Sequence, residues 1–95
     1  MADLKIEVFT SPTCPHCPAA VRATKEFLQE NPDIAERVKW KEMSTASAEG
    51  SRKARAYGIR SVPTIILTNR RGQKGGYVGA PTKRAYMKII TQMLD

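Results

Sequence analysis

The sequence predicts an α/β fold in the order βαβαββα, with a four-stranded mixed sheet and helices on both faces. Three observations support this prediction. Short segments of alternating apolar and polar residues are interleaved with longer segments whose apolar residues recur at helical spacing. The first unit is strand–helix–strand, which implies a parallel pair with a right-handed crossover. The last two strands are joined by a short connection, which implies an antiparallel pair.

Length and composition indicate one globular domain over residues 1–95, of which 41% are hydrophobic and 26% charged. The N-terminal residues lack the basic start and apolar stretch of a signal peptide. No apolar run approaches the roughly 18 residues of a membrane span. We therefore expect a cytoplasmic protein with no membrane partner, in a compartment where structural disulfides are rare.

The first strand is expected at residues 4–9, where apolar and polar positions alternate. A helix is expected over residues 15–30, because its apolar residues share one face and its charged residues the other. Pro15 suits the first helical position. If Cys14 is the N-cap, however, Pro18 disturbs the first turn, so we expect an irregular start. The Asn-Pro-Asp sequence that follows ends this helix.

Residues 38–43 alternate again and predict the second strand. The Ser-Thr-Ala-Ser sequence after it offers N-cap candidates for a helix that reaches Tyr57. Gly58 is a plausible residue to end that helix in the left-handed conformation.

Residues 62–68 are apolar and β-branched, and they predict the third strand. After a turn, residues 73–78 form the fourth strand, in which Gly75-Gly76 suggests a bulge. Residues 79–81 open the last helix. The buried face of that helix is expected to consist of Tyr86, Ile89, Ile90, Met93 and Leu94.

The net charge of +7 is unevenly distributed along the chain. Residues 1–43 carry six Lys/Arg and seven Asp/Glu, whereas residues 44–95 carry ten Lys/Arg and two Asp/Glu. The excess predicts either a basic face that attracts an acidic partner or nucleic acid, or an ordinary solvated surface. The few aromatic residues are not interleaved with the basic ones as a base-stacking surface requires, so a nucleic-acid partner is not expected.

The sequence Cys14-Pro15-His16-Cys17 contains both cysteines and the single histidine of the chain. Cysteines at this spacing can sit one helical turn apart and interconvert between dithiol and disulfide. The alternative is a pair of structural or metal-binding thiols. Two cysteines and one histidine fall short of the four ligands of a closed zinc site, so no metal or other cofactor is expected. A metal or cluster site shared between molecules remains open.

Cys14 is expected to be the nucleophile, because a helix N-terminus stabilises a thiolate. The thiolate would attack a substrate disulfide to form a mixed disulfide, which Cys17 would then resolve. A protonated His16 would stabilise the Cys14 thiolate and make the pair more oxidising. The alternative for His16 is an exposed side chain with little effect.

Three features in register resemble the thioredoxin family: Cys14-Pro15-His16-Cys17 after the first strand, the run from Tyr57 to Thr64, and Gly79-Ala80. The resemblance covers nearly the whole chain. It implies the thioredoxin-like fold in its minimal, glutaredoxin-sized form. It also implies a cis peptide before Pro63, which would leave the Val62 backbone ready to pair with an extended substrate.

The resemblance implies a thiol–disulfide oxidoreductase, and most directly a cytoplasmic protein-disulfide reductase. Its partners would be disulfide-containing proteins and a reductase or low-molecular-weight thiol that recycles it, and we expect a monomer. The implied catalytic residues are Cys14, Pro15, His16 and Cys17. The implied substrate-binding residues are Arg60, Val62, Pro63 and Gly79. Arg60 and the Lys83-Arg84 pair flank these features and are candidates to receive an acidic partner or to remain solvated.

The sequence departs from the family at two positions near the cysteines. Thr13 stands where the family has a tryptophan, and Val8 stands where thioredoxins bury an aspartate that assists proton transfer at the second cysteine. Glu7 is adjacent to Val8 but is predicted to point to the opposite face of the strand. The proton acceptor for Cys17 is therefore left open.

Two other functions remain as alternatives. A glutaredoxin-like, glutathione-dependent reductase would need a Gly-Gly pair followed by an acidic residue before the last helix. Residues 79–83 instead read Gly-Ala-Pro-Thr-Lys, so glutathione binding is not supported. The other alternative is a non-enzymatic protein, either a thiol-based metal carrier or a protein-binding module.

Overall fold

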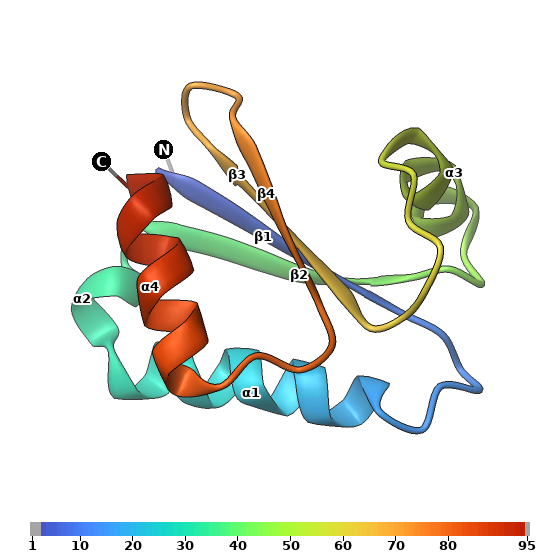
Figure 1. Cartoon of the computed structure of the whole chain (residues 1–95), viewed down its shortest axis with the longest axis horizontal. Helices are drawn as coiled ribbons and strands as arrows, with labels where there is room; N and C mark the ends of the chain where they lie inside the picture. Colours follow the sequence, from blue (N-terminus) through green and yellow to red (C-terminus); the bar gives the residue numbers. More distant parts are fainter. Residues whose placement is uncertain (1–2, 95) are drawn as a thin grey trace.

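The computed structural model describes residues 3–94 and confirms the α/β fold (Figure 1). The strands are β1 (Leu4–Thr10), β2 (Val38–Ser44), β3 (Thr64–Asn69) and β4 (Lys74–Val78). The helices are α1 (Cys17–Glu30), α2 (Pro32–Ala35), α3 (Ala48–Ala56) and α4 (Lys83–Leu94).

The four strands form one mixed sheet in the order β2-β1-β3-β4. β1 pairs in parallel with β2, from Leu4 opposite Val38 to Thr10 opposite Ser44. β3 forms the predicted antiparallel hairpin with β4, and β3 also pairs antiparallel with β1, a pairing that was not predicted. Because β1 and β2 are parallel and in register, their carboxyl ends lie together at one edge of the sheet.

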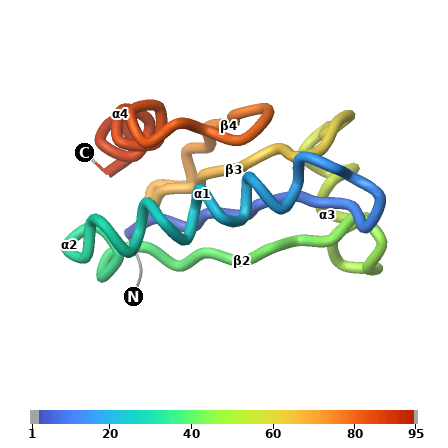
Figure 2. Tube along the Cα trace, turned by 90° about the horizontal axis from the view of Figure 1, so that it is seen from below, coloured from blue at the N-terminus to red at the C-terminus, as the bar shows by residue number. Residues whose placement is uncertain are grey.

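Helices cover the two faces of the sheet unequally. α1 and α4 pack on the face presented by Leu4, Ile6 and Val8, and Figure 2 shows α1 running along this face. The smaller core on the opposite face joins Phe9 to Met43 of β2 and to α3. Successive residues of a strand point to opposite faces of the sheet. The position of a residue along β1 therefore decides which of the two cores it enters.

Glu7 lies on the α3 face, as predicted, and is fully buried. Its carboxylate accepts hydrogen bonds from Lys53 Nζ at 2.9 Å and from the Tyr57 hydroxyl at 3.1 Å. The hydrogen bond with Glu7 raises the pKa of Lys53, and burial raises the pKa of Tyr57. These contacts tie α3 to β1, so Glu7 serves the packing of α3.

The helix after the first strand begins later than predicted. α1 starts at Cys17 with His16 as its N-cap, two residues after the predicted start at Pro15, and Pro15 and His16 lie in a turn ahead of it. The later start places Pro18 in the first turn of α1. A proline is tolerated there, because the N–H that it lacks would have no intrahelical partner.

Two further element boundaries differ from the predictions. Residues after the Asn31 C-cap form the short helix α2, which was not predicted. This helix forms because Pro32, which ends α1, also suits the first position of a new helix. β3 begins at Thr64, so Val62 and Pro63 precede the strand instead of belonging to it. A proline has no N–H to give to a sheet ladder, which accounts for the later start.

The predicted bulge at Gly75-Gly76 is wrong. Both residues pair with β3 in an uninterrupted register. A Cβ at either position would make only ordinary contacts, 3.5 Å from the Met93 sulfur at Gly75 and 3.6 Å from the Ile66 side chain at Gly76.

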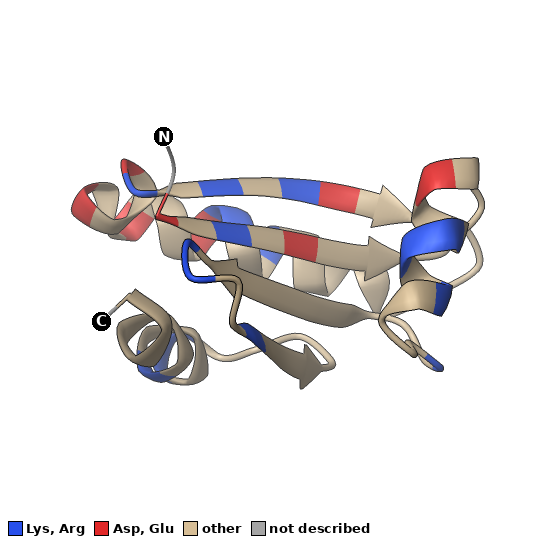
Figure 3. Ribbon diagram, turned by 90° about the horizontal axis from the view of Figure 1, so that it is seen from above, with Lys and Arg blue, Asp and Glu red and all other residues tan. Residues whose placement is uncertain are grey.

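The basic residues of positions 44–95 do not form one face. Arg52 and Arg55 belong to α3 and Lys88 belongs to α4, and these helices pack against opposite faces of the sheet. Figure 3 shows blue lysine bands along β1 and β2, and on each strand a red acidic band lies between them and α3. Within residues 3–94, no helix is both long enough and apolar enough to cross a bilayer.

Tyr86 is a buried residue of the main core whose ionisation makes the stability of the protein depend on pH. Its side chain is 1% exposed, and its hydroxyl is hydrogen-bonded to Thr24 of α1. Burial raises the pKa of Tyr86 to about 12, with the Thr24 hydrogen bond acting in the opposite direction. The native state therefore holds this proton more tightly than the unfolded state does.

We predict that the free energy of unfolding falls as the pH rises from about 10 to about 12, with roughly 3 kcal/mol of the fall due to Tyr86. Urea denaturation at several pH values in this range measures the fall. Tyr86→Phe should make it clearly shallower, with a remaining fall from Lys53 and Tyr57, whose pKa values are also raised. An equal fall in Tyr86→Phe would contradict the prediction.

Candidate active site

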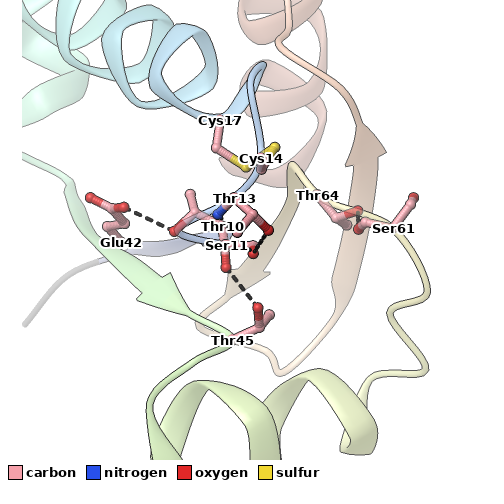
Figure 4. Close-up of a disulfide and its surroundings, with 9 residues drawn as sticks. All are labelled: Thr10, Ser11, Thr13, Cys14, Cys17, Glu42, Thr45, Ser61 and Thr64. Carbon is pink, nitrogen blue, oxygen red and sulfur yellow. Dashed lines mark hydrogen bonds between the residues drawn. A yellow bond between two sulfur atoms is a disulfide. The ribbon is translucent and has the colours of Figure 1, made fainter.

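The loop between β1 and α1 carries Cys14. The Cys14 N–H donates to the Ser11 carbonyl oxygen at 3.1 Å, and the Ser11 and Thr13 hydroxyl oxygens lie 3.2 Å apart. These contacts close a tight turn that leads back to α1. Cys14 and Cys17 are joined by a disulfide, with their Cα atoms 5.4 Å apart (Figure 4).

The two cysteines differ in exposure. Cys14 is partly exposed, whereas Cys17 is 3% exposed. In the reduced protein Cys14 is therefore the sulfur that a substrate can reach. The first intrahelical bond of α1 runs from Ala20 N–H to the His16 carbonyl oxygen, so the N–H groups of Cys17 and Ala19 lie ahead of it. Such N–H groups at a helix N-terminus stabilise a nearby thiolate.

Thr45, the residue after β2, holds the start of the cysteine loop. Its N–H and its hydroxyl both donate to the Thr10 carbonyl oxygen, at 2.8 and 3.0 Å, and Figure 4 shows Thr45 beside Thr10. The carboxyl ends of β1 and β2 are thereby tied together immediately before the loop. This attachment fixes the point from which the loop departs.

The peptide between Val62 and Pro63 is cis. Pro63 is buried, and its carbonyl oxygen accepts a hydrogen bond from the Gly79 N–H at 2.8 Å. Gly79 has φ +100°, a backbone conformation that residues with a side chain rarely adopt. The Thr64 hydroxyl donates to the Ser61 carbonyl oxygen at 2.7 Å. Gly79 thus holds the cis-proline segment in place.

Two recesses meet near the disulfide. The larger, of about 550 Å³, is lined by residues of the cysteine loop and α1 together with Thr10 and Glu42. The smaller, of about 250 Å³, is lined by residues 59–62, Thr45 and Ala54. Ser11 lines both recesses, so the disulfide and the segment before Pro63 belong to one continuous surface.

Most residues predicted for the site gather at this surface. Pro15 and His16 are exposed beside the disulfide, and the exposed Arg60 lines the smaller recess. The start of α4 does not reach the site. Lys83 pairs with Glu30 at 2.7 Å in the last turn of α1, about 20 Å along the helix from Cys17.

Thr10 and Glu42 also line the larger recess, although no sequence motif marks them. The Thr10 hydroxyl donates to Glu42 Oε2 at 2.9 Å. The two residues are 32 positions apart, and only the parallel pairing of β1 with β2 brings them together. No local pattern in the sequence signals that pairing, because it depends on the register between two strands.

The thioredoxin domain family matches this chain over residues 4–91. A protein of Methanocaldococcus jannaschii named "Thioredoxin" is 43% identical over 94 residues, which are 99% of this chain and 100% of that protein. The chain belongs to the thioredoxin family. A "Probable Thioredoxin" of Archaeoglobus fulgidus is 32% identical over 88 residues, covering 93% of this chain and 87% of that one.

Solved structures of the family share the fold. Chloroplastic thioredoxin z superimposes with a TM-score of 0.77 at 20% identity, covering 95% of this chain and 77% of that one. The oxidised mitochondrial thioredoxin 3 of Saccharomyces cerevisiae gives a TM-score of 0.75 at 22% identity, covering 97% and 80%. The family and its cysteine pair make this chain a thiol–disulfide oxidoreductase.

The difference in exposure predicts which cysteine reacts first. In the reduced protein, one equivalent of iodoacetamide should modify Cys14 in preference to Cys17, as read by peptide mass mapping. Iodoacetamide reacts with the thiolate. A fall of one unit in the pKa of a thiol, from about 8.5, by itself raises its thiolate fraction near neutral pH about tenfold. In urea the two cysteines should be labelled nearly equally. Preferential labelling of Cys17 in the folded protein would contradict this assignment.

Proposed function

We propose that this chain is a cytoplasmic protein-disulfide reductase that works through a mixed disulfide between Cys14 and its substrate. The observation that carries the proposal is the pairing of a partly exposed Cys14 with a buried Cys17. This arrangement suits a division of labour in which one sulfur meets the substrate and the other releases it.

In the first step the Cys14 thiolate attacks one sulfur of a substrate disulfide. A bond forms between Cys14 and that sulfur, the substrate S–S bond breaks, and the second substrate sulfur leaves as a thiolate. The N-terminus of α1 stabilises the Cys14 thiolate, and His16 adds positive charge when protonated. Pro15, with its fixed φ, restricts the backbone between the cysteines.

In the second step Cys17 attacks the Cys14 sulfur. The Cys14–Cys17 disulfide forms, and the substrate sulfur leaves with the electron pair, so that the substrate disulfide is fully reduced. A Cα separation of 5.4 Å supports this step, since it is a normal distance for a disulfide.

The segment before Pro63 is proposed to bind the substrate backbone. Val62 lines the smaller recess ahead of β3, where an extended peptide can pair with its main chain as an added strand. Pro63, held by Gly79, sets the position of Val62. Arg60 is exposed at the same recess and is placed to contact acidic side chains of a substrate.

The oxidised pair is proposed to be returned to the dithiol by a reductase or a low-molecular-weight thiol. The protein would act as a monomer and without a metal or other cofactor. Among the described residues of one chain, no group of three or more His, Cys, Asp or Glu side chains is placed to hold a metal ion.

Insulin reduction in the presence of dithiothreitol tests the proposal. The wild-type protein should accelerate it, and Cys14→Ser should abolish the acceleration because the nucleophile is lost. Cys17→Ser, reduced and then mixed with insulin after dithiothreitol has been removed, should accumulate a mixed disulfide at Cys14, detectable by mass spectrometry, because resolution is blocked.

Two results would refute the proposed function. One is retention of wild-type turnover in Cys14→Ser. The other is protein purified under reducing conditions that carries stoichiometric zinc or iron and shows no turnover.

A further inference from the structure

We propose that Glu42, acting through the Thr10 hydroxyl, accepts the proton that Cys17 loses in the second step. This inference rests on the proposed function and adds two residues to its site. Cys17 attacks as a thiolate, so its thiol must first be deprotonated. With the side chain 3% exposed, that proton needs a local route to an acceptor.

The carboxylates of β1 do not provide that route. Val8 stands where thioredoxins bury an aspartate, and it packs in the main core. Glu7 is on the other face of β1, where Lys53 and Tyr57 bind its carboxylate. The acceptor must therefore come from another element.

Glu42 of β2 lies directly opposite Val8 in the parallel register. Glu42 therefore supplies a carboxylate beside Val8 from the neighbouring strand. The Thr10 hydroxyl donates to Glu42 Oε2 at 2.9 Å, and Thr10 is 3% exposed. Figure 4 shows Thr10 below the disulfide and Glu42 to its side.

Thr10, Cys17 and Glu42 all line the larger recess. The hydroxyl of Thr10 has one proton, which it gives to Glu42, and two lone pairs that can accept a proton from the cysteine side. The other charged side chains that line this recess are Arg22 and Lys25, both from α1. Among the described residues around the recess, Glu42 supplies the carboxylate.

Thr10 passes its hydroxyl proton to the Glu42 carboxylate and receives the Cys17 proton in exchange. The Cys17 thiolate then forms its bond to the Cys14 sulfur, and the bond between Cys14 and the substrate sulfur breaks. The departing substrate thiolate, or solvent, takes the proton from Glu42. The dithiol is oxidised and the substrate disulfide is reduced.

Stopped-flow reaction of the reduced protein with equimolar dithiobis(nitrobenzoate) separates the two steps. Attack by Cys14 releases one coloured thiolate in a concentration-dependent phase. Resolution by Cys17 releases the second in a phase that does not depend on concentration. The thionitrobenzoate thiolate is a good leaving group, so the rate of the second phase depends mainly on deprotonation of Cys17.

We expect Glu42→Gln to slow the second phase near neutral pH by about tenfold or more. This is less than the roughly 10²- to 10⁴-fold that general acid–base catalysis typically contributes, because Thr10 lies between the two groups. The difference from wild type should shrink above the ordinary thiol pKa of about 8.5, where the thiol ionises unaided. The first phase should keep its rate within about twofold, since Cys14 needs no such acceptor.

Matched variants test the route. Thr10→Val should slow the second phase as Glu42→Gln does, Thr10→Ser should restore it, and the double variant should be no slower than either single one. Glu36→Gln, which removes an exposed carboxylate at the end of α2, should leave both phases unchanged.

An unchanged second phase in Glu42→Gln, or equal slowing of both phases, would overturn the inference. Failure of the proposed function is a separate result: the wild-type protein would release neither thiolate rapidly.

Discussion

The confinement of β1 on all sides is the constraint on which the site depends. Its backbone is paired with β2 on one edge and β3 on the other, and its side chains from Ile6 to Thr10 are at most 3% exposed. Truncating one such aliphatic side chain to alanine typically costs about 2–5 kcal/mol, a large part of the roughly 5–15 kcal/mol that stabilises a small domain. These contacts hold the end of β1, and the cysteine loop leaves the sheet from this point.

The two faces of the sheet hold carboxylates with different tasks. Glu7 is buried among cations and a tyrosine and fastens α3 to the sheet. Glu42 lies at an exposed recess that also reaches the disulfide. A one-residue shift of β2 against β1 would move the Glu42 side chain to the other face of the sheet. The pairing of the two strands is thus as important to the proposed chemistry as the cysteine motif.

Much of the fold could be predicted from the sequence because the local signals agree with the final structure. Alternation in β1 and β2, helical spacing in α1 and α4, and the Ser47 cap of α3 all reflect residues close in sequence. The start of α1 could not be predicted, because Pro15 and Pro18 are both acceptable at a helix start and the loop contacts of Cys14 decide between them. Gly75-Gly76 likewise resembles a bulge locally, yet both residues keep an unbroken pairing with β3.

Some residues of the candidate site could likewise be predicted from the sequence, and others could not. Cys14 and Cys17 were evident from their spacing, and the cis-proline from a family pattern. Thr10 and Glu42 were not, because their contact joins positions 32 residues apart through the strand register. The structure also assigns Gly79 a contact, to Pro63, that the sequence pattern could not specify.

The reduction potential of the Cys14–Cys17 pair, measured by equilibration against defined thiol buffers, tests the central claim most directly. A reductase requires a potential close to that of known reductants, so the account predicts a value at or below about −250 mV. A value at or above about −180 mV, typical of isomerases and oxidases, would contradict the proposed direction of electron flow.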